Sequence, residues 1–152
     1  MRLFAMTLTL GMSAALVCVA ADQASLTQKE AEDLTNKIYV QQCDADTVFQ
    51  QTVKLGAVNK SAYIYGSLKP ETVYPVQKTF SGSCVAHPMG RTDWGTVDAK
   101  YTTNFYRDSF GDWKHTPVLG VCNYQRTAYQ VEGQPKVDKP DAKGSCNFAE
   151  KQ

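Results

Sequence analysis

The chain has 152 residues, with 16 Lys and Arg against 15 Asp and Glu, and 11% of its residues are aromatic. This length suits one domain, and the aromatic content together with the low net charge excludes a disordered chain. Without residues 1–21 the chain keeps 15 basic and 15 acidic side chains, because that segment contains Arg2 and no acidic residue. A chain with no basic surplus is poorly suited to a phosphate backbone or an anionic lipid surface, so we expect no nucleic-acid partner.

The first 21 residues are typical of a removable signal peptide. Arg2 supplies a positive start, an apolar run follows from residue 3 to residue 17, and small residues precede a cleavage point after Ala21. The apolar run is shorter than the roughly 20 residues of a membrane-spanning helix. Lipidation at Cys18 is disfavoured because Val17, directly before it, is not small. We therefore predict a secreted or periplasmic protein with no membrane span in its mature chain.

Export would leave four cysteines, an even number that suits an oxidising compartment. They are Cys43, Cys84, Cys122 and Cys146. No two lie within a few residues of each other, unlike the ligands of most zinc sites, so we expect two disulfides and no metal or other cofactor. Three pairings are open. We favour Cys122–Cys146, which would fix the end of the chain, and Cys43–Cys84, which would tie the helical region to a strand.

A first helix is expected to begin near Thr27. Thr27 and Glu30 have the spacing of a capping box, and Leu26 and Ala31 stand where a hydrophobic staple would close. One face of this helix is expected to hold Ala31, Leu34, Ile38 and Gln41.

A second, shorter helix is expected from Asp46 to Leu55. Asp44 or Asp46 would cap it, and Gly56 would end it. Its buried side would hold Val48, Phe49, Thr52 and Val53.

From Ser61 onward the apolar period changes to two, which predicts strands. A short strand is expected at Ala62–Tyr65, then a turn at residues 66–70 and a longer strand at Val73–Ala86. A loop from Ala86 to Trp94 should follow.

The strongest pattern is a hairpin from Thr96 to Tyr124. Asp108, Ser109, Phe110 and Gly111 suit a type I turn with a left-handed glycine. That turn sets Asp108 opposite Asp112 and predicts a register that can be tested, with a bulge near Pro117. The expected apolar face holds Val97, Ala99, Tyr101, Thr103 and Phe105 opposite Trp113, His115, Pro117, Leu119 and Val121.

These elements predict an α+β fold in which N-terminal helices pack on a curved antiparallel β-sheet. Residues 22–131 would form this disulfide-stabilised single domain. Residues 132–152 are rich in Lys, Asp, Pro and Gly and would form a polar tail tethered through a disulfide.

The two histidines are the starting point for any enzymatic hypothesis. His115 falls on the apolar face opposite Phe105, where a structural role is favoured. His87 lies in a loop, where Asp93 could orient it as a general base. A small secreted hydrolase using His87 with His115 or Asp93 is therefore one alternative.

The remaining pattern favours a non-enzymatic protein over an enzyme, because no catalytic set converges in the sequence. We expect an exported binding or inhibitory protein whose partner is a protein or small ligand of that compartment. Tyr106, expected on the outward face of the hairpin beside Lys114, and His87 are the candidate partner-binding residues. A structural component of an envelope or surface assembly is a further alternative.

Overall fold

The structure is a computed structural model that describes residues 25–43, 49–140 and 143–151. The expected signal peptide, the cap positions Asp44 and Asp46, and Val48 lie outside these residues. One helix, α1, spans Gln28–Thr35. The strands of the described residues are β1 Ile38–Val40, β2 Phe49–Leu55, β3 Asn59–Ala62, β4 Glu71–Ala86, β5 Arg91–Arg107, β6 Trp113–His115, β7 Leu119–Val131, β8 Val137–Asp138, β9 Lys143–Ser145 and β10 Phe148–Glu150.

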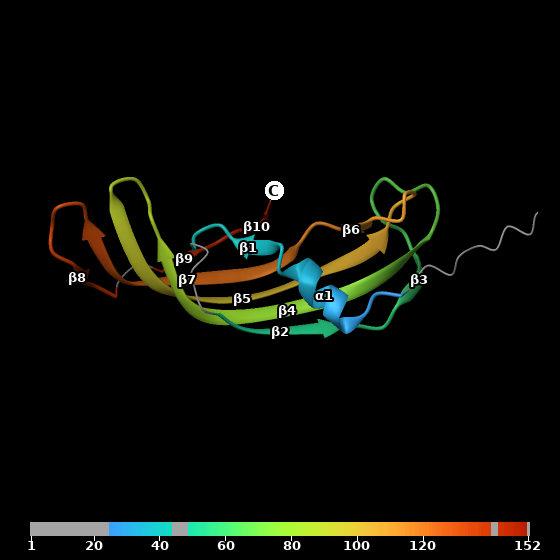
Figure 1. The fold of residues 1–152 in the computed structure, drawn as a ribbon, viewed down its shortest axis with the longest axis horizontal. Helices are drawn as coiled ribbons and strands as arrows, with labels where there is room; N and C mark the ends of the chain where they lie inside the picture. The colour runs from blue at the N-terminus through green and yellow to red at the C-terminus, as the bar shows by residue number, and fades with distance from the viewer. Residues whose placement is uncertain (1–24, 44–48, 141–142, 152) are drawn as a thin grey trace, which may run out of the picture.

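The long antiparallel sheet is the main body of the fold (Figure 1). Its strand order is β2-β4-β5-β7-β8, with β3 beside β4, β6 beside β5 and β9 beside β7. β1 and β10, from opposite ends of the described chain, form a separate two-stranded sheet. Over the residues that the structure describes, the fold is mostly antiparallel sheet with one short helix, so the expected α+β fold with several N-terminal helices is overstated.

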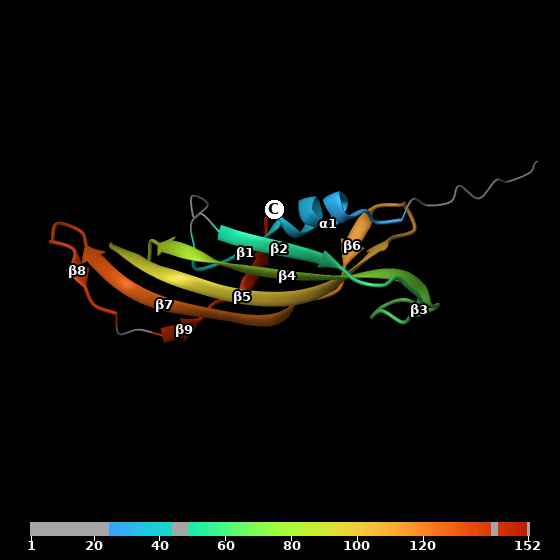
Figure 2. The same cartoon turned by 90° about the horizontal axis from the view of Figure 1, so that it is seen from below.

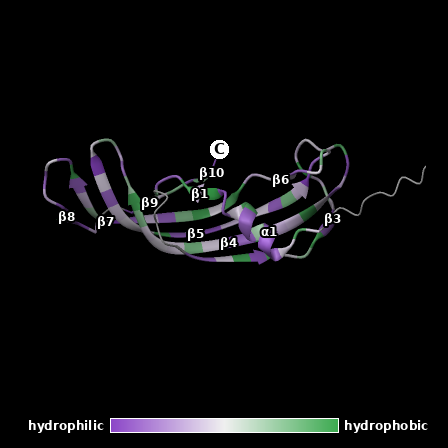
Figure 3. Ribbon diagram, in the orientation of Figure 1, coloured by the Kyte–Doolittle hydropathy of each residue, from purple (hydrophilic) through white to green (hydrophobic). Residues whose placement is uncertain are grey.

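The sheet curves, and one of its two faces carries the second layer. Figure 2 shows α1 on this inner face, and β1 and β10 pack on the same face through Ile38, Val40 and Phe148, which contact buried residues of the long strands. Buried and less buried residues alternate along β5 accordingly, and Figure 3 shows the matching alternation of hydropathy along the long strands.

The buried residues of the inner face form two clusters. One lies beneath β1 and β10 and contains Ile38, Val40, Phe80, Cys84, Val97, Ala99, Tyr101, Cys122 and Cys146. The other lies beneath α1 and contains Leu26, Ala31, Tyr74, Val76 and Phe105.

The start of α1 is the one that the sequence predicts. Thr27 Oγ1 accepts from Glu30 N at 3.2 Å, and Glu30 Oε2 accepts from Thr27 N at 2.9 Å. The hydrogen bonds that the backbone N–H and the hydroxyl of Thr27 donate to the Glu30 carboxylate lower the pKa of Glu30. The helix ends at Thr35, before the expected positions Ile38 and Gln41. Ile38 instead begins β1, where alternate residues are buried.

The expected second helix is wrong, because its described residues form β2. All seven residues of this strand pair with β4, from Phe49 opposite Gly82 to Leu55 opposite Val76. Val53 and Leu55, two residues apart, pack against the cluster beneath α1. The apolar positions fit either period over so short a segment, and the long neighbouring strand decides in favour of pairing.

The shortest predicted strand is displaced toward the N-terminus. β3 spans Asn59–Ala62 instead of Ala62–Tyr65 and pairs with the start of β4. The predicted turn follows, with Gly66 at φ 88° and Ser67 N donating to Ile64 O at 3.1 Å.

The hairpin turn between β5 and β6 is confirmed. Gly111 has φ 87°, and Asp108 N donates to Asp112 O at 2.9 Å. Asp108 Oδ1 accepts from the backbone N–H groups of Phe110 and Asp112, both at 2.9 Å. Desolvation would raise the pKa of Asp108, but these hydrogen bonds and the charge of Lys114 outweigh it and lower the pKa.

The predicted register is confirmed up to the bulge and is wrong beyond it. Phe105 pairs with His115 as expected. After Pro117 the pairing is displaced by one residue, so Tyr101 faces Gly120, where a β-carbon would lie 2.6 Å from the Tyr101 Cα. Leu119 and Val121 therefore point outward and are 69% and 63% exposed.

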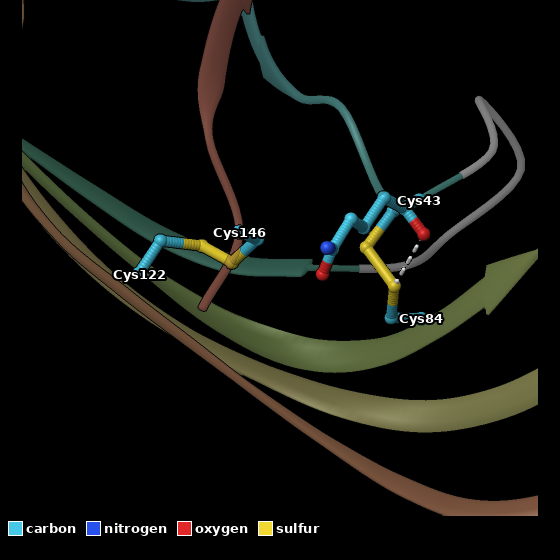
Figure 4. The surroundings of a disulfide bond; sticks show 5 residues. Cys43, Cys84, Cys122 and Cys146 are labelled. Carbon is cyan, nitrogen blue, oxygen red and sulfur yellow. Dashed lines mark hydrogen bonds between the residues drawn. A yellow bond between two sulfur atoms is a disulfide. The ribbon is translucent and has the colours of Figure 1, made fainter. Parts of the chain in front are cut away.

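The C-terminal segment of the described chain is tied closely to the sheet. β9 pairs with β7, and β10 brings the ring of Phe148 to 4.9 Å from that of Tyr101. Both disulfides are present, in the favoured pairing Cys43–Cys84 and Cys122–Cys146, with Cα–Cα distances of 5.1 and 5.2 Å. Figure 4 shows both bonds on the same side of the long strands.

Candidate binding face

The structure separates the two histidines of the hydrolase hypothesis. His87 is exposed in the turn between β4 and β5, next to the Ala86–Asp93 pair. His115 faces Phe105 near the other end of β5. The strand from Asp93 to Phe105 covers roughly 40 Å. The two imidazoles therefore do not converge on one site.

His115 joins β6 to β10. Its Nδ1 lies 2.6 Å from Thr116 O, its Nε2 contacts Glu150 Oε1, and its ring packs edge-on against Phe105. A hollow of about 480 Å³ adjoins it, lined in part by Gly120 and Phe148. Both ring nitrogens of His115 therefore have partners within the fold.

Asp93 belongs to a charged cluster on the inner face. It is 7% exposed, its Oδ2 accepts from Arg91 at 2.8 Å, and Arg126 Nη1 lies 3.9 Å from its Oδ1. Burial raises the pKa of the nearby Tyr124, and the charge of Asp93 adds to the rise while both arginines oppose it. The carboxylate thus balances the charges of two arginines.

Tyr106 lies on the outer face opposite Lys114, as expected. It is half-buried. Nothing in the structure tests its role in partner binding, which stays a prediction together with that of His87.

The outer face of the sheet carries two straight rows of polar side chains, which we call the polar array. Both rows follow directly from the strand register, because residues directly opposite each other share a face. The first row consists of Ser83, Thr96, Gln125 and Lys143, on β4, β5, β7 and β9. The second consists of Gln50, Ser81, Asp98, Asn123 and Ser145, and also crosses β2.

A broad, shallow hollow of about 710 Å³ lies over the array. Its lining includes both rows from β4 to β7 together with Lys143. All nine residues of the array are exposed. Within the described part of the chain, no hydrogen bond or ion pair involves their side chains. Their hydroxyl, amide, carboxylate and ammonium groups are therefore directed to solvent.

The inner face holds the array in place. Along β4, β5 and β7 the array residues alternate with inward neighbours, such as Val97 between Thr96 and Asp98, which is 2% exposed. β9 would be a weak edge by itself, but Cys146 directly follows it, bonds to Cys122, and donates from its N to Cys122 O at 3.2 Å. The fourth strand of the array thus depends on a disulfide on the opposite side.

Part of this site was visible in the sequence and part was missed. The outward positions Asp98, Lys100 and Thr102 of β5 follow from simple alternation. The neighbours on β7 do not, because the bulge after Pro117 exchanges the two faces of that strand. A glycine opposite a large residue, as Gly120 lies opposite Tyr101, was the available signal of that exchange.

The described residues contain no group of three or more His, Cys, Asp and Glu side chains placed to hold a metal ion. Among these residues, α1 is too short and polar to cross a membrane. The array offers hydroxyl and amide groups together with one carboxylate, of Asp98, and one ammonium group, of Lys143. Comparison with protein-family models, with curated proteins and with solved structures finds no match to this chain.

Proposed function

We propose that this protein is an exported, non-enzymatic binding or inhibitory protein that holds its partner against the outer face of the sheet. The observation that supports this most strongly is the polar array: two in-register rows of exposed side chains with unused hydrogen-bonding groups over one hollow. Two disulfides are typical of proteins outside the cytoplasm, which supports the exported compartment.

A rigid sheet is a suitable support for such a site. Side chains on neighbouring strands are held at fixed spacing by backbone pairing, so little ordering is left to occur when a partner binds. The inner face, in contrast, is largely covered by α1, β1 and β10 and by the two core clusters.

The test is a capture experiment with two matched variants. The mature chain, residues 22–152, is immobilised and exposed to material from its own exported compartment. Asn123→Arg places a bulky charge in the hollow, whereas Asp33→Arg places the same side chain on the exposed side of α1. Retained material is identified by mass spectrometry and by sugar analysis.

We expect a partner that the wild-type and Asp33→Arg proteins retain and that Asn123→Arg loses. Circular dichroism and an intact mass with both disulfides formed verify that each variant is folded. Equal retention by all three proteins, or no partner at all, would contradict the proposal.

A further inference from the structure

We infer that the ligand of the polar array is an uncharged carbohydrate chain. This inference rests on the proposed function and adds the chemical class of the partner. It depends on three features of the outer face: the kinds of polar group, their spacing, and an indole ring on the same face.

The groups of the array both donate and accept hydrogen bonds. Hydroxyl and amide side chains do both, and they make up seven of the nine positions of the two rows. Asp98 adds an acceptor and Lys143 a donor, so the array has no net charge. A partner that satisfies these groups needs many hydroxyls or amides close together and no charge of its own, which is the composition of a neutral glycan.

The spacing of the groups suits a chain lying across the strands. Neighbouring strands are about 4.8 Å apart and outward residues of one strand about 6.7 Å apart. The array is therefore a grid of polar groups at a separation similar to the width of a sugar ring. Because the hollow is shallow and the array side chains that line it are exposed, a polymer can continue beyond it at both ends.

Trp94 provides a flat apolar surface next to the grid. It lies on β5 two residues before Thr96, hence on the same face, and is half-buried. Lys136 Nζ lies 4.8 Å from the centre of its ring. The C–H face of a sugar ring can pack on an indole ring while its hydroxyls reach the neighbouring polar groups. Trp94 is thus placed to contact a ligand that occupies the hollow.

Other partner classes fit these residues less well. An anionic polymer would meet the carboxylate of Asp98 at the centre of the second row, whose other four side chains carry no charge. Strong protein contacts centre on buried aromatic or apolar anchors, whereas all nine side chains of the array are polar. A peptide that adds as a strand needs a free sheet edge, and the array is on a sheet face.

The two tryptophans allow a direct test. Trp113 packs on the inner side against Tyr74 and Arg107, far from the hollow in the sheet register. In the variant Trp113→Phe, all indole fluorescence therefore reports on Trp94. The probes are neutral hexasaccharides of glucose, of mannose and of N-acetylglucosamine, and an anionic heparin hexasaccharide serves for comparison.

We expect a saturable change in Trp94 fluorescence with at least one neutral hexasaccharide and none with the anionic one. Asn123→Ala and Asp98→Ala, each in the Trp113→Phe background, should weaken binding about tenfold, the usual effect of losing a hydrogen bond to a charged or well-placed group. Asp33→Ala is the matched control and should bind like its parent. Calorimetry with unaltered protein verifies the affinity without relying on the indole.

The inference is overturned if none of the neutral hexasaccharides binds at about 10 mM, where even a Kd of ~1 mM gives near saturation, or if binding is insensitive to Asn123→Ala and Asp98→Ala. The capture experiment separates this failure from that of the proposed function. If the capture experiment finds a protein partner that Asn123→Arg loses, and no sugar binds, the proposed binding face stands and the carbohydrate inference is refuted. If both experiments fail, the proposed function and the carbohydrate inference are both refuted.

Discussion

Lys78, on β4, is a buried cation whose ammonium group lies at the C-terminal end of α1. It is 4% exposed, and its Nζ donates to Asn36 Oδ1 at 2.9 Å and to Thr35 O at 3.4 Å. The same carbonyl accepts from the hydroxyl of Tyr101 at 3.2 Å, the register partner of Lys78. A cation is favourable at a helix C-terminus. Burial nevertheless lowers the pKa of Lys78 to about 8, and repulsion from Lys151 acts in the same direction.

This lowered pKa predicts that stability rises with pH above about 8. Between pH 8 and the ordinary value of 10.5, the unfolded chain binds a proton at Lys78 that the folded chain has released. The unfolding free energy should therefore rise, with a limiting slope of about 1.4 kcal/mol per pH unit for one proton. The raised pKa of Tyr101 lowers the unfolding free energy as the pH rises above the ordinary value of 10.0, because the unfolded chain then loses a proton that the folded chain keeps. Denaturant unfolding of the oxidised protein is therefore measured below about pH 9.5.

The matched variants are Lys78→Met and Lys100→Met, the second on the exposed outer face. Lys78→Met should abolish the rise, whereas Lys100→Met should keep it. A wild-type unfolding free energy that stays level or falls between pH 8 and 9.5 would show that Lys78 keeps its proton inside the fold.

At the scale of the element, the β5–β6 hairpin depends on one left-handed residue. Gly111 has φ 87°, and its N donates to Asp108 O at 3.0 Å. A β-carbon at that φ costs about 1–2 kcal/mol. Gly111→Ala should lower the unfolding free energy by that amount in denaturant titrations. Gly144→Ala, where no atom lies within 4 Å of the added carbon, should have a much smaller effect. Equal losses in both variants would contradict the turn assignment.

Local signals explain which elements the sequence predicts. The capping box at Thr27 and the turn at Asp108–Gly111 are recognised because the residues that interact are three or four positions apart. The segment of β2 has the pattern of a short helix, but pairing with β4, more than twenty residues later in the chain, decides its structure. Patterns of seven residues do not contain that information.

The candidate site was only partly predictable for the same reason. Each row of the polar array joins residues from four or five strands, and its alignment depends on how every pair of strands is registered. The bulge near Pro117 was predicted, but its consequence, an exchange of faces from Leu119 onward, depends on Gly120 fitting against Tyr101. That contact becomes apparent only when both strands are placed.

At the scale of the whole molecule, the two disulfides constrain different parts of the fold. Cys43–Cys84 joins the segment after β1 to the end of β4 across 41 residues, and Cys122–Cys146 joins β7 to the segment between β9 and β10 across 24. Through restriction of the unfolded chain alone, each bond contributes on the order of 3–4 kcal/mol, slightly more for the longer loop. The two bonds therefore contribute similar amounts to the unfolding free energy of the protein. They differ in which segment of the chain they hold in place.

Removal of each bond in turn should separate these effects. In Cys122→Ser/Cys146→Ser, β9 keeps only a three-residue pairing with β7, so hydrogen exchange at residues 143–150 should accelerate. Because Lys143 belongs to the polar array, binding at the outer face should weaken as well. In Cys43→Ser/Cys84→Ser the global unfolding free energy should fall by a similar amount while exchange in β9 and binding stay near wild type. Unchanged exchange at residues 143–150 in the first variant would mean that backbone pairing with β7 and packing of Phe148 hold this strand without the covalent bond.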